Sequence, residues 1–281
     1  MTVGSASAPA SSANLGPGFD TLGLALALRC TATVELADAM TISERGSTRR
    51  LGSGDMIARA AMLAIGQSVH VTLDNDVPRA SGMGSSSAVV ASVAGAALKA
   101  AGGDSSAARV YEIAAELEGH GDNAAAAVFG GFVAVADGGI KRLDLDPSIR
   151  IVVGIPDAPL RTVDARAALS DSIPRDVVCR SLSRLAFLIE GLRDANIEVL
   201  QHAAGDELHE APRASLSPVT GDMIAAALGG GALHAAWSGA GPTAIAFTTQ
   251  ESLGRVIGAM SGALGTRGEV LTLDVDYDGL I

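Results

Sequence analysis

Aromatic side chains, charges and cysteines are all scarce in this chain of 281 residues. Aromatic residues make up 3% of it, so the core has to be built from Ala, Val, Leu and Ile, and close packing of the elements is expected. Charged residues reach only 18% and hydrophobic residues 48%, which excludes a disordered chain. The net charge of −11 argues against sequence-independent nucleic-acid binding, which depends on Lys and Arg. The length fits one large domain or two ordinary ones.

Several further classes are excluded by what is missing. Cys30 and Cys179 are too few and too far apart for a disulfide framework or a zinc site, so a reduced, cytoplasmic setting is expected. Residues 1–5 contain no basic segment ahead of an apolar one, so no secretory signal is expected. The runs 80–98 and 223–250 carry no charge, but glycines and hydroxyls interrupt both. We therefore expect them to be buried or ligand-lining rather than membrane-spanning.

The most distinctive stretch is 78–88, Pro-Arg-Ala-Ser-Gly-Met-Gly-Ser-Ser-Ser-Ala, which runs into an Ala- and Val-rich segment expected to form a buried helix. A helix N-terminus leaves N–H groups unpaired, and Gly82 and Gly84 allow a ligand to approach the backbone closely. Three consecutive serines add donors for phosphate and oxygen ligands for Mg²⁺. The pattern predicts a phosphate-binding loop. The alternative is an ordinary serine cap after a plain glycine turn.

Two other polar stretches are candidates for a site. Segment 8–20 is dense in turn-forming residues and is expected to be a loop that carries Asn14 and Asp20 at the start of a strand. Segment 118–123, Glu-Gly-His-Gly-Asp-Asn, is a charged cluster beside an apolar run in a chain poor in charge. Local turn bonds in the first stretch and a solvated, capped loop in the second are the alternatives.

Three glycine-rich stretches in this order, 8–20, 78–88 and 238–243, resemble the three signatures of the GHMP kinases, the family of galactokinase, homoserine kinase, mevalonate kinase and phosphomevalonate kinase. Within the family the first stretch is similar to that of the homoserine kinases. Two more stretches agree with those kinases, 118–123 with 129–132, and 209–218.

The resemblance implies an α+β, two-domain fold. Residues 1–150 would form a nucleotide-binding domain resembling the ribosomal protein S5 domain 2-like fold. Residues 151–281 would form a ferredoxin-like α/β sandwich that closes the substrate cleft. The implied reaction is the ATP- and Mg²⁺-dependent phosphorylation of L-homoserine on its side-chain hydroxyl, a step toward threonine. A GHMP kinase acting on mevalonate, shikimate or a sugar is the nearest alternative, and a non-catalytic ligand-binding kinase fold is another. Homoserine and ATP would be the partners, with no nucleic acid or membrane, and a homodimer is left open.

The resemblance also implies roles for individual residues. The ATP-binding set is Pro78, Ser81, Gly82, Met83, Gly84, Ser85, Ser86, Ser87 and Ala88. The homoserine-binding set is Asn14, Asp20, His120, Asn123, Arg166, Arg213 and Gly239. In that set Asp20 would face the ammonium, and the two arginines suit a carboxylate. Ser86 and Glu112 would hold Mg²⁺, and together with Asn123 they form the expected catalytic set.

Position 123 has a mechanistic consequence, because sister kinases of the family place a carboxylate base near it. The amide of Asn123 cannot accept the hydroxyl proton, so the implied mechanism is positioning plus charge neutralisation, with the proton passing to a phosphate oxygen. Three departures from the family pattern stand out. An Ala-rich run follows Asn123 where the family has Asn-Val-Ala-Pro. Gly121 replaces a usual proline, and Met56 stands near a position where an asparagine for the adenine is expected.

Overall fold

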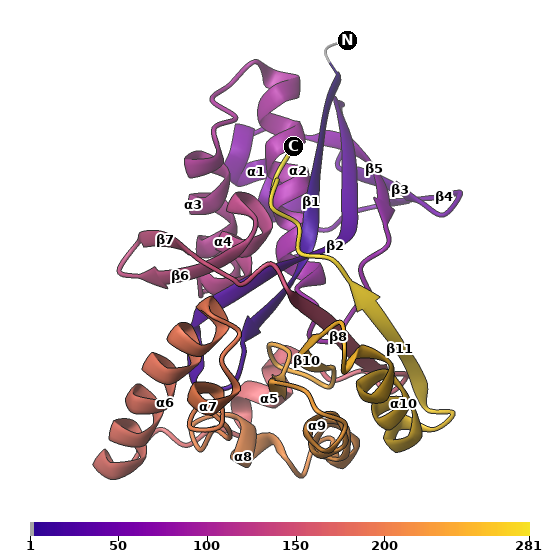
Figure 1. Cartoon of the computed structure of the whole chain (residues 1–281). Coiled ribbons are helices and arrows are strands. Elements are labelled where there is room, and N and C mark those ends of the chain that lie inside the picture. Colours follow the sequence, from indigo (N-terminus) through magenta and orange to yellow (C-terminus); the bar gives the residue numbers. More distant parts are fainter. Residues whose placement is uncertain (1–2) are drawn as a thin grey trace.

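The computed structural model describes residues 3–281, which form two β-sheets with helices packed on them (Figure 1). The elements up to the second sheet are β1 (Val3–Asn14), β2 (Gly18–Leu36), β3 (Thr41–Glu44), β4 (Ser47–Arg50), α1 (Met56–Ile65), β5 (Val69–Asn75), α2 (Ser85–Ala101), α3 (Ala107–Glu118), α4 (Asp122–Phe129), β6 (Phe132–Ala136) and β7 (Gly139–Leu143). The rest are β8 (Ile149–Pro156), α5 (Thr162–Ala167), α6 (Arg175–Arg193), α7 (Ile197–Leu200), α8 (Glu210–Arg213), α9 (Pro218–Gly229), β9 (His234–Trp237), β10 (Ala244–Thr249), α10 (Leu253–Leu264) and β11 (Gly268–Leu273).

The first sheet is built around the long strand β2. Its strand order is β4-β3-β5-β2-β6-β7, and β1 pairs with β2 in addition. The helix expected after the serine-rich loop is α2, which is buried on almost every side and packs against β1, β2 and α1. Its alanines and valines let the neighbouring backbones approach closely, as a core poor in aromatic residues requires.

The interpretation of segment 8–20 as a loop is wrong for most of its length. Residues 3–14 form β1, and only the short turn before β2 is irregular. The small residues of β1 have weak strand propensity, but they fit the narrow space between β2 and α2. At Gly4 the fit is so close that a Cβ atom would collide with the carbonyl of Ala96.

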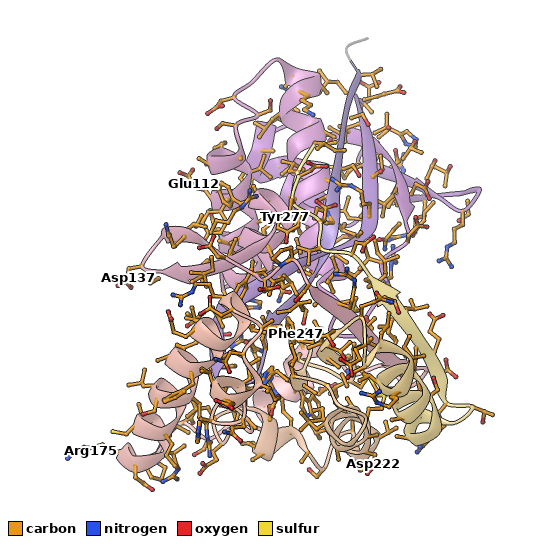
Figure 2. The ribbon with its side chains drawn as sticks, in the orientation of Figure 1. Glu112, Asp137, Arg175, Asp222, Phe247 and Tyr277 are labelled. Carbon is orange, nitrogen blue, oxygen red and sulfur yellow. The ribbon has the colours of Figure 1, made fainter. Side chains whose placement is uncertain are left out.

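The second sheet has the order β11-β8-β10-β9, with every neighbouring pair antiparallel. Along the chain, helices lie between β8 and β9 and between β10 and β11. This is the ferredoxin-like arrangement expected for the C-terminal half. One face packs against α9 and α10 through a cluster that includes Val152, Met223 and Met260. Residues of the other face, such as Ile151 and Phe247, join the main core, and Phe247 lies in the middle of the molecule (Figure 2).

The chain's last residues return from the second sheet to the first, ending beside β1 (Figure 1). The backbones of Ser7 and Ile281 exchange two hydrogen bonds of 2.9 Å, and Asp276 forms an ion pair with Arg29 of β2. The two sheets are joined by the segment 144–148, close to the boundary expected at residue 150. No helix among residues 3–281 combines the length and apolar character that crossing a membrane requires.

Candidate active site

A pocket lies where the N-terminus of α2 meets the turn before β2, the start of α4 and the loops of the C-terminal half. Its lining consists of Asn14, Phe19, Asp20, Ala80, Ser81, Gly82, Gly84, Ser85, Ser86, Ser87, Glu118, His120, Asp122, Asn123, Thr162, Arg166, Arg213, Gly239 and Ala240. Most residues expected to bind ATP or homoserine are therefore brought together. Four expected site residues, Pro78, Met83, Ala88 and Glu112, are absent from the lining.

The N-terminus of α2 has the properties of an anion site. Gly84 is the N-cap residue, with φ of 64°, and no side chain caps the helix. The first bond inside the helix runs from the Ala88 N–H to the Gly84 carbonyl, so the amides of residues 85–87 have no partner within the helix. These amides and the positive end of the helix dipole meet at the pocket.

The glycines of this loop are required by close packing as well as by backbone angle. Gly82 has φ of 85°, and a Cβ atom there would collide with the Ser238 carbonyl. A Cβ at Gly84 would collide with the Ser11 hydroxyl. The second glycine-rich loop packs directly on the first, since the Ser238 hydroxyl donates to the Gly82 carbonyl at 2.7 Å. The C-terminal half thus holds the loop in place.

The side chains of this loop do not all face the pocket. Met83 and Ala88 are fully buried in the core, so only their backbone could meet a ligand. The Ser85 hydroxyl donates to the Val77 carbonyl at 3.3 Å. The Ser86 hydroxyl, expected to bind Mg²⁺, lies 2.8 Å from the Met56 sulfur and would have to turn toward the pocket to do so.

The prediction that Glu112 binds a metal is wrong. Its side chain is 64% exposed, forms an ion pair with Arg109 at 3.1 Å and lies at the periphery of the molecule (Figure 2). Glu118, six residues further along α3, projects about 120° away around the helix axis and lines the pocket. One oxygen of Glu118, Oε1, is buried without a hydrogen-bond partner among residues 3–281. That unpaired oxygen is a fitting ligand for Mg²⁺, which prefers carboxylates.

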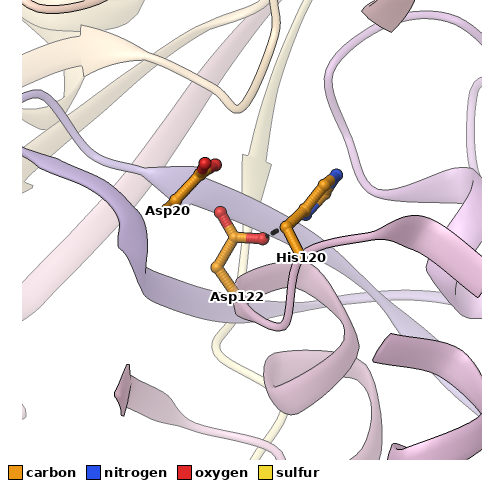
Figure 3. A group of neighbouring side chains, drawn as sticks. All are labelled: Asp20, His120 and Asp122. Atoms are coloured by element: carbon orange, nitrogen blue, oxygen red, sulfur yellow. Dashed lines mark hydrogen bonds and ion pairs between the residues drawn. The ribbon is translucent and has the colours of Figure 1, made fainter. Parts of the chain in front are cut away.

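Three ionisable side chains that line the pocket, Asp20, His120 and Asp122, lie close together (Figure 3), and one ligand atom from each lies within 4.8 Å of the others. The Asp122 carboxylate is buried and accepts hydrogen bonds of 2.7 Å from the His120 ring and from the backbone N–H of Asn123. Burial disfavours the charged ring of His120, but the hydrogen bond and charge of Asp122 outweigh burial, and the pKa of His120 is raised. Two carboxylates facing one space favour a cation there.

The two residues expected to bind opposite ends of the substrate are paired with each other. Arg166 donates to both oxygens of Asp20, at 2.7 and 3.2 Å, and both side chains remain about one-third exposed. Beneath them the ring of Phe19 lies 5.7 Å from the guanidinium groups of Arg166 and Arg213. This part of the pocket therefore holds negative and positive groups side by side, and a zwitterion could bind there by dividing the Asp20–Arg166 pair between its two charged ends.

Arg213 is the largest fully buried side chain of the protein's described part. Its Nε donates to the Ala165 carbonyl, and its Nη1 donates to the His209 ring at 3.0 Å and to the Gly239 carbonyl at 3.2 Å. Its Nη2 makes no hydrogen bond to residues 3–281 and is left to meet a ligand. Burial, followed by the repulsion of Arg166, lowers the pKa of Arg213 to about 10, so it stays charged at neutral pH.

The two asparagines of the site are held by protein contacts. Asn14 is 4% exposed, donates to the Gly239 carbonyl at 2.9 Å and accepts from the Asp20 amide at 3.0 Å. Its geometry suits the holding of Asp20 better than a direct contact. The Oδ1 atom of Asn123 accepts from the Ser11 hydroxyl at 2.8 Å, which places this amide between Gly84 and the acidic group.

Several residues around the pocket were missed by the sequence interpretation. Glu118 and Asp122 flank His120 inside a stretch that had been recognised, so their position was a usable signal. Ser11, Phe19 and His209 stand in stretches that had been recognised, but their part in the site depends on contacts with distant segments, which the sequence does not show.

Comparison with known proteins gives two family matches. Residues 51–131 match the GHMP kinases N terminal domain, and residues 188–265 match the GHMP kinases C terminal domain. Homoserine kinase of Desulfitobacterium hafniense is 37% identical over 96% of this chain and 97% of that protein. Homoserine kinase of Thermus thermophilus is 38% identical over 95% of this chain and 94% of that protein.

Solved structures agree at the level of the fold. The crystal structure of homoserine kinase from Cytophaga hutchinsonii aligns with a TM-score of 0.88 and 24% identity, covering 100% of this chain and 97% of that one. The mevalonate kinase of Methanococcus jannaschii aligns with a TM-score of 0.71 at 11% identity, over 96% of this chain and 97% of that one. With relatives this similar along nearly the full length, the chain belongs to the homoserine kinase family of the GHMP kinases.

Proposed function

We propose that the protein transfers the γ-phosphoryl group of ATP to the side-chain hydroxyl of L-homoserine, giving ADP and O-phospho-L-homoserine for threonine synthesis in the cytoplasm. The observation that carries the proposal is one pocket that joins an uncapped helix N-terminus to a set of carboxylate and guanidinium side chains. The first part suits phosphate, and the second suits an amino acid.

The phosphate end of the reaction falls to the loop 81–87. Its amides would hold the β- and γ-phosphates, and glycine at 82 and 84 keeps that backbone open to them. Glu118, together with a serine of the loop, would hold Mg²⁺, which neutralises charge on phosphate oxygens when bound. A second depression on the outer side of the loop, lined in part by Arg49, Met56 and Arg79, would receive the nucleoside.

The amino-acid end of the substrate would be bound by Asp20 and Asp122 and by Arg166 and Arg213. Asp20 and Asp122 would face the ammonium, and Arg213 would bind the carboxylate through its remaining Nη2 donor. Arg166 would then donate one hydrogen bond to Asp20 and another to the substrate carboxylate. With both charged ends fixed, the side-chain hydroxyl points toward the loop, where Asn123 meets Gly84.

The transfer needs positioning more than base catalysis. The Asn123 amide, held by Ser11, would donate to the hydroxyl oxygen and align it with the γ-phosphorus. A bond forms from this oxygen to phosphorus as the bond to the β-phosphate oxygen breaks. The hydroxyl proton passes to an oxygen of the transferred phosphoryl group, which a loose transition state permits. Amides at the helix N-terminus stabilise the charge that develops on the phosphates.

An ADP-release assay across homoserine, mevalonate, shikimate and sugars tests the proposal. We expect homoserine to be turned over at the highest kcat/KM. Good turnover of another alcohol with none of homoserine would assign the protein to a different GHMP kinase reaction. Binding of both ligands without turnover would make it a ligand-binding kinase fold. A homodimer stays a prediction, to be checked by light scattering.

A further inference from the structure

The turn between β1 and β2 has an unfavourable backbone. Asn14, Leu15 and Gly16 all have positive φ, of 70°, 56° and 88°. Consecutive left-handed residues other than glycine each cost of order 1 kcal/mol, so they persist only where surrounding contacts hold them. Leu15 is fully buried, and this turn leads directly to Asp20.

Two buried histidines from the C-terminal half hold this turn. The ring of His209, just before α8, lies 2.7 Å from the Gly16 carbonyl through Nε2. The ring of His234, in β9, lies 3.0 Å from the Leu15 carbonyl through Nε2. Neither histidine lines the pocket. Each of two adjacent carbonyls of the turn is thus hydrogen-bonded by one histidine ring from an element far away in the sequence.

The partners fix the tautomer and charge of both rings. A carbonyl can only accept, so each Nε2 carries the hydrogen. The Nδ1 atom of His209 faces the Nη1 donor of Arg213 and must accept, so His209 is neutral. Burial lowers the pKa of His209 and of His234 to about 4, which keeps both rings neutral at physiological pH. The His209 ring also stacks on Phe19, with centroids 5.2 Å apart.

We propose that His209 and His234 are positioning residues for the homoserine end of the site, holding the turn at residues 15–16 and through it Asn14 and Asp20. The inference rests on the proposed function for its choice of substrate. The chain of contacts is direct, because Asn14 accepts from the Asp20 amide and also bonds to Gly239 beside Arg213. Loss of either histidine hydrogen bond frees the strained turn and displaces the Asp20 carboxylate.

His234 gives the cleaner test, because within residues 3–281 its ring hydrogen-bonds only to the turn. His234→Gln keeps an N–H donor near the Nε2 position, and His234→Leu removes it. We expect His234→Leu to raise the KM for homoserine roughly tenfold, the usual effect of losing one buried hydrogen bond, and to leave the KM for ATP nearly unchanged. His234→Gln should restore most of the homoserine KM.

His209 separates the turn from the arginine. His209→Gln keeps a donor toward Gly16, and His209→Asn keeps an acceptor near the Nδ1 position for Arg213. We expect His209→Asn, which loses the donor to Gly16, to raise the homoserine KM selectively and to speed amide exchange at the turn, whereas His209→Gln should leave that exchange near the wild-type rate. The matched control is His70→Gln, because His70 bonds to Thr41 and Ser43 at the far strands of the first sheet. It should leave both KM values unchanged.

Hydrogen exchange of the backbone amides of residues 15, 16 and 18–20 is measured on the same proteins, since it requires no substrate; Pro17 has no N–H. We expect faster exchange at these amides in His234→Leu than in the wild type, with His234→Gln in between and thermal melts confirming that each variant is folded. Unchanged exchange in folded His234→Leu, or equal losses for both substrates, would overturn the positioning role. If the wild type fails to phosphorylate homoserine, the proposed function fails, and exchange still decides this inference.

Discussion

Glu118 and Glu112 stand on the same helix and differ in what surrounds them. Glu112 already has a partner in Arg109 and is open to solvent, whereas Glu118 presents a buried oxygen without a partner among residues 3–281 to the pocket. A carboxylate in the second situation is strongly stabilised by a nearby cation. Solvent screens the ion pair between Arg109 and Glu112, so that pair contributes little to stability or binding.

Replacing each glutamate by glutamine tests this difference. We expect Glu118→Gln to lower kcat at least 100-fold, about 3 kcal/mol of transition-state stabilisation, because a neutral amide is a poor Mg²⁺ ligand. Glu112→Gln should retain kcat within about twofold. Steady-state rates measured over a range of Mg²⁺ concentrations check both. Equal loss in the two variants, or a wild-type rate for Glu118→Gln, would contradict the assignment.

At this scale the sequence predicted most residues of the pocket, but Glu112 lies outside it. Asp20, His120, Asn123 and Arg213 stand in recognisable stretches, and Arg166 came from the family resemblance alone. The choice among three glutamates of α3 depends on where the helix ends and which side packs on its neighbours, and neither is readable from local spacing. Ser11 and His209 are linked to the site only through tertiary contacts.

The connection between α3 and α4 explains why glycine stands at position 121. A Cβ atom at Gly121 would collide with the hydroxyl of Tyr111, which stands about two turns before the end of α3. The Tyr111 ring packs on Phe129 of α4, with centroids 5.6 Å apart, so it cannot swing away freely. The tyrosine hydroxyl therefore fills space that a side chain at 121 would need.

A double-mutant cycle tests this coupling. We expect Gly121→Ala to destabilise the wild type by about 1 kcal/mol through overpacking. In a Tyr111→Phe background, which lacks the colliding oxygen, the same change should cost roughly half as much or less. Urea unfolding of the four proteins gives the coupling energy. Equal costs in both backgrounds would show that strain at 121 has another source.

Among the elements, α2 follows from its composition, since the Ala- and Val-rich segment after the serine-rich loop forms the expected buried helix. β1 did not, because Ala, Ser and Pro lack the β-branched bulk that marks a strand. Its small residues are selected by the narrow gap beside α2, which is a property of the assembled layers rather than of the segment.

At the scale of the whole molecule, the two halves are interlocked at the pocket. The tail that follows β11 pairs with β1 and β2, and the loops of the C-terminal half hold the phosphate loop. The same contacts bury His209 and His234 and partly bury Glu210, three ionisable groups near the junction. The resemblance to a family predicted two domains, but these junction contacts join residues over 150 positions apart and have no local signature.

The three ionisable groups give stability opposite dependences on pH. The histidines have pKa values lowered from 6.5 to about 4, so their contribution is complete above pH 6.5 and is lost as the pH falls toward 4. Burial raises the pKa of Glu210 from 4.5 to about 7, although the hydrogen bond that Glu210 accepts from the Trp237 backbone N–H acts in the opposite direction. Its contribution is complete below pH 4.5 and is lost as the pH rises through 7. Between pH 4.5 and 6.5 the two histidines outweigh one glutamate, so the wild type should lose stability on acidification.

Substituting Glu210 separates these terms. The amide oxygen that Glu210→Gln introduces can still accept from the Trp237 N–H, but the new side chain carries no charge, so the variant should be more stable than the wild type at about pH 8 by about 1–3 kcal/mol. Below pH 6.5 the variant lacks the compensating proton uptake, so its free energy of unfolding should fall more steeply than that of the wild type, by up to about 1.4 kcal/mol per pH unit. Urea unfolding from about pH 4.5 to about pH 8 measures both slopes, and Glu251→Gln at an exposed position serves as the control. Parallel profiles for Glu210→Gln and the wild type would mean that Glu210 titrates as an ordinary carboxylate, and that its burial at the junction is relieved by water.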